Sequence, residues 1–164
     1  MRVVGVGIVD RNQQPVYLLP VLRRDHPEAV TAASLSQYMY ASLDAVEERV
    51  RWVLVAASVS GAKRHPLDAY LGPVYAGSHG TVYAYTSNAR NTVLLLVRSD
   101  MAVVREADVR ALMLKLLQRF VHSLCNPFHG LGDDALESAA FDADVRRLLE
   151  RAAPASVAAA PSGG

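Results

Sequence analysis

Three side chains near residue 125 have the chemistry to hold a metal ion or to act as a nucleophile. His122, Cys125 and His129 place two imidazoles and one thiol within a short stretch of sequence. Imidazole nitrogen and thiolate sulfur are ligands that zinc prefers, and a thiolate next to an imidazole is a nucleophilic pair. Asp133 and Asp134 follow closely, so carboxylates that could complete a zinc site are also present.

The surroundings of this cluster favour a plainer interpretation. Asn126-Pro127 must end a helix between the two histidines, because proline disfavours the helical conformation of the residue before it. The same break would place Phe128 against the core, although Asn-Pro-Phe is alternatively an exposed motif for a partner domain. A lone cysteine at an apolar helix end is typically a small core residue. We therefore predict no metal, no cofactor and no enzymatic activity, and keep a small enzyme that uses Cys125 with His122 as an alternative.

Glycine-rich segments give no support for nucleotide binding. Gly5-Val-Gly7 resembles the start of a dinucleotide loop, but Asp10 occupies the position of the third glycine and the pattern that follows predicts a strand instead of a helix. The sequence contains no phosphate-binding loop of the G-x-x-x-x-G-K-[ST] type and no G-x-S-x-G nucleophile elbow. Residues 77–80 (GSHG) are predicted to form a hairpin turn.

Residues 36–55 carry the strongest candidate for a binding surface. Their apolar positions recur at helical spacing and predict one buried stripe, made of Met39, Leu43, Val46, Val50 and Val53. At about 100° per residue, a second set falls on the opposite face. It mixes aromatic residues, Arg and an apolar spot, as interface anchors do. We predict a partner interface formed by Tyr40, Asp44, Glu48, Arg51, Trp52 and Val55.

A solvated surface is the alternative for this face. Charged belts on helices are mostly exposed to water, and Glu47 and Arg51 have the spacing of a favourable i,i+4 pair. In that case Trp52 would be covered by the loop at residues 58–67.

The strand pattern predicts a five-stranded antiparallel sheet. Residues 3–9 and 92–97 are apolar at consecutive positions, which indicates central strands buried on both faces. Residues 15–21 and 70–76 contain prolines, which cannot donate to a ladder, so these two should be edge strands. Residues 81–86 lie between two turn segments and should join the neighbouring strands in a meander.

Two further helices are predicted beside the one at residues 36–55, which Ser34 or Ser36 would cap. Residues 105–124 carry the more pronounced stripe, and residues 138–152 repeat the pattern on Phe141, Val145, Leu148 and Leu149. Central strands need cover on both faces, so the first helix should lie on one side and the later pair on the other. The stripe of the second helix is Val109, Leu112, Met113, Leu116, Leu117, Phe120, Val121 and Leu124.

Length and composition limit the remaining possibilities. The 164 residues suit one domain, predicted at 1–152, with a disordered tail at 153–164 rich in small residues and proline. A formal net charge of +1 lacks the positive excess that nucleic acid or a polybasic membrane contact requires. No stretch approaches the roughly 18 apolar residues of a spanning helix. One cysteine, no glycosylation sequon and no signal peptide favour the cytosol.

Several short motifs occur together in an order that resembles the sedlin family of vesicle-tethering subunits. The resemblance runs from Val3 to about Arg151, nearly the whole predicted domain, and each motif alone would be weak. The motifs are Ser42-Leu43-Asp44, Tyr70-Leu71-Gly72, the segment from Val82 to Asn88, Cys125-Asn126-Pro127-Phe128, Gly132-Asp133 and Phe141-Asp142.

The resemblance implies an α+β, longin-like (SNARE-like) fold with one helix on one sheet face and two on the other. It also implies a non-enzymatic subunit or assembly factor of the TRAPP tethering complex, acting in transport from endoplasmic reticulum to Golgi and within the Golgi. Its partners would be other TRAPP subunits. A Rab GTPase would be served indirectly, by supporting nucleotide exchange on it, and no nucleic acid or direct membrane insertion is implied. Asp44 matches the family's helix aspartate, which implies a partner-facing role for it.

The departures from the family pattern lie at residues 26–36, 60–66 and after 153. They affect the loop contacts that the resemblance implies and do not affect the implied fold. A longin regulatory domain of a SNARE-type protein is the main alternative of the same fold. That class needs a heptad helix and a membrane anchor after the domain, and residues 153–164 contain neither.

Overall fold

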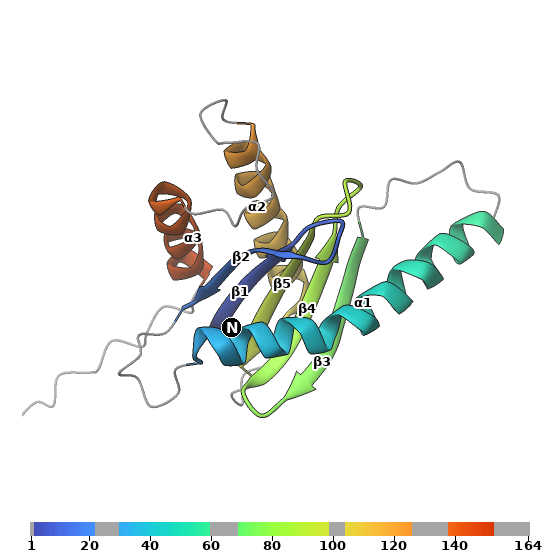
Figure 1. The fold of residues 1–164 in the computed structure, drawn as a ribbon, viewed down its shortest axis with the longest axis horizontal. Helices are drawn as coiled ribbons and strands as arrows, with labels where there is room; N and C mark the ends of the chain where they lie inside the picture. The colour runs from blue at the N-terminus through green and yellow to red at the C-terminus, as the bar shows by residue number, and fades with distance from the viewer. Residues whose placement is uncertain (1, 22–29, 60–68, 99–103, 126–137, 153–164) are drawn as a thin grey trace, which may run out of the picture.

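The computed structural model describes residues 2–21, 30–59, 69–98, 104–125 and 138–152 (Figure 1). Along this part of the chain, two strands are followed by one helix, three strands and two further helices. Their bounds are β1 Arg2–Val9, β2 Pro15–Pro20, α1 Ala32–Val59, β3 Ala69–Gly77, β4 Gly80–Thr86, β5 Thr92–Arg98, α2 Glu106–Leu124 and α3 Ala139–Ala152.

The strands form one antiparallel sheet in the order β2-β1-β5-β4-β3. β1 and β5 are interior strands and are buried along almost their whole length. The two proline-containing strands, β2 and β3, are the edges, where a missing backbone N–H costs least. The predictions of central strands, edge strands and the β3–β4–β5 meander are therefore confirmed, and the fold is the predicted α+β arrangement with one helix on one face and two on the other.

On one face, α1 lies close to the sheet because β1 carries glycine where the helix crosses it. A Cβ atom at Gly5 would overlap the Leu35 side chain, and one at Gly7 would come within 2.8 Å of Met39 Sδ. The two glycines that resembled a dinucleotide loop thus create room for a helix. The buried cluster on this face includes Val4, Leu35, Met39, Leu43, Val46, Val82, Leu94 and Leu96.

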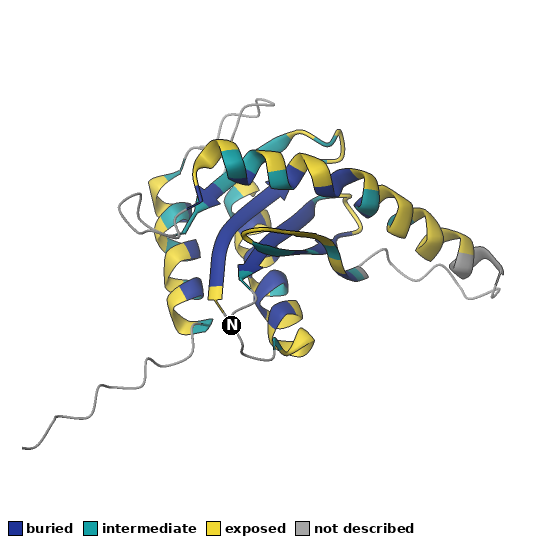
Figure 2. Ribbon diagram, turned by 90° about the horizontal axis from the view of Figure 1, so that it is seen from below, coloured by how far each residue is buried: buried dark blue, intermediate teal, exposed yellow. Residues whose placement is uncertain are grey.

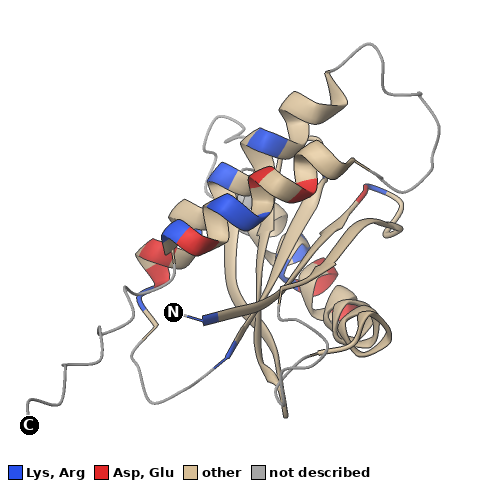
Figure 3. Cartoon of the chain, turned by 90° about the vertical axis from the view of Figure 1, so that its left-hand side faces the viewer, with Lys and Arg blue, Asp and Glu red and all other residues tan. Residues whose placement is uncertain are grey.

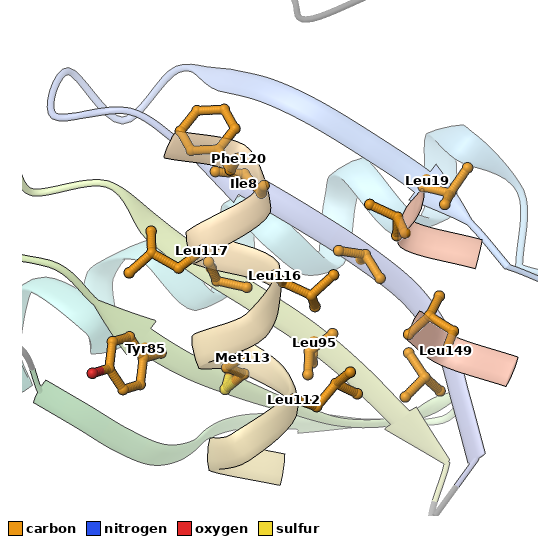
Figure 4. Close-up of a cluster of buried hydrophobic side chains, with 14 of the residues drawn as sticks. Ile8, Leu19, Tyr85, Leu95, Leu112, Met113, Leu116, Leu117, Phe120 and Leu149 are labelled. Atoms are coloured by element: carbon orange, nitrogen blue, oxygen red, sulfur yellow. The ribbon is translucent and has the colours of Figure 1, made fainter. Parts of the chain in front are cut away.

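On the other face, α2 and α3 cover a larger cluster (Figure 4). α2 lays its apolar stripe along the sheet, and α3 adds Phe141, whose ring meets Tyr17 edge to face at 4.7 Å between centroids. The Tyr17 hydroxyl donates a 2.7 Å hydrogen bond to Asp142, which ties edge strand β2 to α3. The buried residues that α2 and α3 contribute are Val109, Leu112, Met113, Leu116, Leu117, Phe120, Phe141, Val145 and Leu149.

Some helix predictions were wrong at the ends of the helices. α1 is longer than residues 36–55, and Thr31 lies at its start in place of Ser34 or Ser36, its Oγ1 accepting the Ser34 N–H at 3.1 Å. Val53 was predicted in the core but is 40% exposed. Val121 and Leu124 at the end of α2 are exposed as well. In both helices the apolar stripe continues beyond the point where side chains are buried.

Charges lie on the helices and turns and avoid the sheet (Figure 3). The five strands carry only two charged residues, Arg2 and Arg98, one at the start of β1 and one at the end of β5. In the described ranges, no helix is both long and apolar enough to cross a membrane. The predicted tail at 153–164 lies outside the described residues.

Candidate partner-binding face

Hydrogen bonds from side chains hold α1 to the sheet at several points along its length. Near its start, the Tyr38 hydroxyl accepts the backbone N–H of His79 at 3.0 Å in the β3–β4 turn. Further along, the Arg49 guanidinium donates to the Leu71 carbonyl oxygen on β3. On the opposite side, Gln13 in the β1–β2 turn donates from its amide to the Glu47 carboxylate. These bonds determine which face of α1 points away from the sheet.

The Arg49 bond explains the Tyr70-Leu71-Gly72 motif. The register of β3 against β4 shifts between Tyr70 and Gly72, so the Leu71 carbonyl is available to a side chain. Gly72 has a φ of +74°, in the left-handed region that glycine occupies without strain. The motif therefore provides a backbone hydrogen-bond acceptor on an edge strand. The hydrogen bond from Arg49 to this acceptor holds α1 against the sheet.

All six residues predicted to form a partner interface are exposed on α1. Tyr40 is 51% exposed, Trp52 67% and Val55 48%. Asp44, Glu48 and Arg51 are also exposed. At a rise of about 1.5 Å per residue, the set extends over roughly 22 Å of helix. The structure thus places these residues on one helix and leaves them accessible, and their role as an interface stays a prediction.

Near the end of α1, a run of consecutive apolar residues is exposed to solvent. Figure 2 shows the buried stripe of α1 giving way to exposed residues where the helix runs past the sheet. Residues 52–55 (WVLV) are all exposed, with Val53 at 40% and Leu54 at 39%. Trp52 is 67% exposed. Most of the loop at residues 58–67, which the alternative placed over Trp52, lies outside the described residues. Contiguous exposed apolar residues on a soluble domain are characteristic of a protein interaction site.

The charged residues of the helix fall into two groups. Glu47 and Arg49 are engaged by Gln13 and Leu71 and serve the fold. The side chains of Asp44, Glu48 and Arg51 make no hydrogen bond or ion pair within the part of the chain that the structure describes. The predicted Glu47–Arg51 pair was wrong, because the Gln13 amide takes the Glu47 carboxylate instead. An unpaired Arg side chain beside Tyr and Trp side chains is a combination that is enriched at interfaces.

Comparison with known proteins identifies the family. The Sedlin family matches residues 8–151, most of the chain. The chain belongs to the Sedlin family.

Its relatives include three proteins named trafficking protein particle complex subunit 2-like protein. The mouse protein (Mus musculus) is 27% identical over 148 residues, covering 89% of this chain and 96% of its own. The bovine protein (Bos taurus) is 24% identical over 146 residues, with the same coverage. The protein of Dictyostelium discoideum is 24% identical over 151 residues, covering 90% and 96%.

The cysteine and the histidine at the end of α2 are both exposed in this Sedlin domain. Cys125 is exposed at the end of α2, so the prediction of a small core residue was wrong. The helix ends there with its last turn beyond the buried cluster, as the exposure of Val121 and Leu124 shows. His122 is exposed too, and no hydrogen bond joins it to Cys125. In the described ranges no three His, Cys, Asp or Glu side chains gather as a metal site would require. His129, Asp133 and Asp134, like Phe128, lie outside those ranges.

Three tyrosines with raised pKa values lie on the opposite side of the domain, with α2 and α3. Burial, followed by the hydrogen bond to Asp142, raises the pKa of Tyr17. Burial raises the pKa of Tyr70 to about 12, with a smaller contribution from Glu106, and raises the pKa of Tyr83 in the same way. The Tyr70 hydroxyl is buried and has no hydrogen-bond partner among the described atoms. The main cause of all three shifts is therefore the packing of the tyrosine rings against the core.

The sequence analysis did not single out Leu54, or the arginines of the β1–β2 and β4–β5 turns, as exposed residues near the outer face of α1. Leu54 lies between two predicted interface residues, and the uninterrupted apolar run at 52–55 was the signal that could have found it. Arg11 and Arg90 belong to turns that the antiparallel topology brings to the same end of the sheet. Strand order alone would have placed them together, beside the second half of α1.

Proposed function

We propose that this chain is a non-enzymatic subunit or assembly factor of a TRAPP-type vesicle-tethering complex. It acts in transport between endoplasmic reticulum and Golgi and within the Golgi, as a cytoplasmic protein attached to these membranes through its partners. Membership of the Sedlin family supports this role, as do the names of the relatives, which are similar over most of their length. It supports nucleotide exchange on a Rab GTPase by holding the complex together, and its own residues take no part in that reaction.

The observation that carries the proposal is the outer face of α1. This helix is fastened to the sheet by one side and exposes aromatic, apolar and unpaired charged residues on the other. Such a face has no role in the stability of the isolated domain. A neighbouring subunit that covered Tyr40 and Trp52 would bury two large aromatic anchors, which is the kind of contact that dominates binding energy.

The experiment compares complex recovery with domain stability. We expect the double variant Tyr40→Ala with Asp44→Arg to weaken the complex by at least about 2 kcal/mol, through a lost anchor and a misplaced charge. The free energy of unfolding of the isolated domain should change by about 0.5 kcal/mol or less. The tagged variant is expressed in its own cells, the co-purifying tethering subunits are quantified, and denaturant unfolding is measured on the purified domain.

A matched variant makes the comparison specific. Val121→Ala with Glu150→Arg changes one exposed apolar residue and one exposed carboxylate on the opposite helical layer. This control should leave both recovery and stability as in the wild type. Size fractionation of native extract provides an independent test, in which migration only at the monomer size of 17.7 kDa would contradict the proposal. Equal losses of recovery in both double variants would contradict the assignment of the face.

A further inference from the structure

A pocket of about 260 Å³ lies between the second half of α1 and one end of the sheet. The β1–β2 turn contributes Arg11 and Gln13, and the β4–β5 turn contributes Arg90. Its apolar lining comes mainly from α1, with Leu43 and Leu54 at the two ends of the helical segment that borders it. This surface differs from the outer face of α1, since neither Tyr40 nor Asp44 borders it.

The charges around the pocket are unbalanced. Both lining carboxylates are used within the domain. Asp10 Oδ1 accepts the backbone N–H groups of Asn12 and Gln14, each at 2.8 Å, and Glu47 accepts the Gln13 amide. By contrast, the side chains of the three lining arginines make no hydrogen bond or ion pair to any described residue; they are Arg11, Arg51 and Arg90. The lining thus carries three guanidinium groups against two carboxylates, and none of the three guanidinium groups forms an ion pair with a described residue.

The two turns that border the pocket are held in an unusual backbone conformation. Gln13 has a φ of +63° and Arg90 a φ of +61°, the two positive values found for non-glycine residues in the described ranges. Residues other than Gly, Asn and Asp adopt this left-handed region rarely, because it is sterically strained for them. Both strained residues line the same pocket. The fold therefore holds the two turns at the edge of the pocket in a defined conformation.

We propose that this pocket binds a short acidic segment of a partner protein, with an apolar side chain inserted against α1 and flanking carboxylates on the arginines. Guanidinium groups pair with carboxylates through parallel hydrogen bonds, and apolar walls favour an aliphatic or aromatic anchor. A free inorganic anion would leave the apolar walls unused, and a purely apolar segment would leave the arginines unpaired. The inference goes beyond the proposed function, because it concerns a second surface and a stated ligand chemistry.

The test uses a fluorescent peptide with a central Leu-Phe pair flanked by three glutamates on each side, titrated with the purified full chain. Arg11→Glu with Arg90→Glu should weaken binding about tenfold, because two attractive charge contacts become repulsive. Leu54→Gln should weaken binding as well, by removing an apolar contact. The control Arg110→Glu with Lys115→Glu makes the same change in net charge on α2 and should bind like the wild type. Circular dichroism and melting temperature verify that each variant is folded.

Other ligands provide the outcomes that would overturn the proposal. A peptide with glutamines in place of the glutamates, and one with serines in place of Leu-Phe, should each bind markedly less well. Equal binding of either peptide would contradict the acidic-apolar ligand. Displacement of the peptide by inorganic phosphate, or binding to phosphatidylserine vesicles that the Arg11 and Arg90 variant loses while peptide binding persists, would point to a plain anion or lipid site.

The outcome also separates this pocket from the outer face of α1. The Tyr40→Ala with Asp44→Arg variant should bind the peptide as the wild type does, because neither residue borders the pocket. Arg51 borders both surfaces and is left unchanged in every variant. Absence of peptide binding together with normal recovery of tethering subunits would overturn the pocket proposal alone. Peptide binding that persists while recovery is lost in the Tyr40 and Asp44 variant would support both surfaces.

Discussion

The two faces of the sheet are covered by helices that look alike in sequence and behave differently in the fold. α2 buries its apolar stripe from Val109 through Phe120, about three turns of helix, and α3 covers the side of the cluster. α1 begins in the same way, with Leu35 and Met39 buried, but its stripe is already exposed at Val53. Its apolar residues continue while the sheet beneath it ends (Figures 1 and 2).

The difference shows that the domain buries the apolar surface of α2 but leaves part of the apolar surface of α1 exposed. A hydrophobic periodicity shows what a helix is able to bury, whereas the extent of the sheet determines what it does bury. The α2–α3 side uses its apolar residues within the chain. The far end of α1 leaves Trp52 to Val55 exposed, beside charged side chains that have no partner in the described structure. Exposed apolar residues of this kind are typical of protein interaction sites, so we expect a partner to cover this end of the helix.

The largest expected effect comes from one substitution made on both faces. Leu116→Ala removes a fully buried side chain beneath α2 and should lower the free energy of unfolding by about 2–5 kcal/mol. Leu54→Ala removes the same atoms from the exposed end of α1 and should change it by about 0.5 kcal/mol or less. Urea unfolding of both variants gives the comparison. Similar losses would mean that the end of α1 is part of the core, and the contrast between the two faces would be wrong.

The division between the faces also explains how far the sequence could lead. Strand order, edge prolines and the placement of helices followed from local patterns, because consecutive apolar runs such as 92–97 have few alternatives to central strands. The end of burial on α1 could not be predicted, because it depends on where β3 and the two turns stop, which is a relation between distant segments. The exposure of Cys125 was missed for the same reason, since it depends on how far α2 extends beyond the cluster.

The exposed residues of α1 that are predicted to bind a partner could be identified from the sequence only as one face of a helix. The angular spacing of Tyr40, Asp44 and Arg51 places them together on any straight helix, and the structure agrees that they are exposed. Whether Glu47 pairs with Arg51 or with the distant Gln13 is decided by tertiary geometry, and local spacing gave the wrong answer. The arginine-lined pocket is likewise formed by three segments that are separate in the sequence, so no single motif predicts it.

The second prediction tests the seating of the first half of α1. Gly5→Val places a branched side chain where Leu35 lies, and we expect a loss of about 1–3 kcal/mol in the free energy of unfolding from overpacking. Ala76→Val adds a similar side chain at an exposed position on edge strand β3 and serves as the control, with little change expected. Combining Gly5→Val with Leu35→Ala should recover part of the loss, which a double-mutant cycle measures. No loss in Gly5→Val would mean that α1 is not in close contact with β1.

The smallest expected effect concerns the hydrogen bond that fastens β2 to α3 on the better-covered face. Tyr17→Phe removes the hydroxyl that donates to Asp142 and should lower the free energy of unfolding at neutral pH by about 1 kcal/mol. The pKa of Tyr17 is raised in the folded state, first by burial and then by this hydrogen bond. A tyrosine ionises near pH 10 when the chain is unfolded, so the wild type keeps this contribution below about pH 10 and loses it as the pH rises further. Because phenylalanine does not ionise, the variant lacks that alkaline loss.

The stability difference between wild type and Tyr17→Phe should therefore shrink, or change sign, between about pH 7 and about pH 11. Urea midpoints at the two pH values measure it, and the other tyrosines contribute equally to both proteins. Tyr40→Phe, on the exposed face of α1, is the control, because its hydroxyl takes no part in the tie between β2 and α3. A difference that stays constant with pH would show that the raised pKa of Tyr17 does not contribute to folding. The contrast between a face that uses its side chains internally and one that presents them outward would then rest on apolar burial alone.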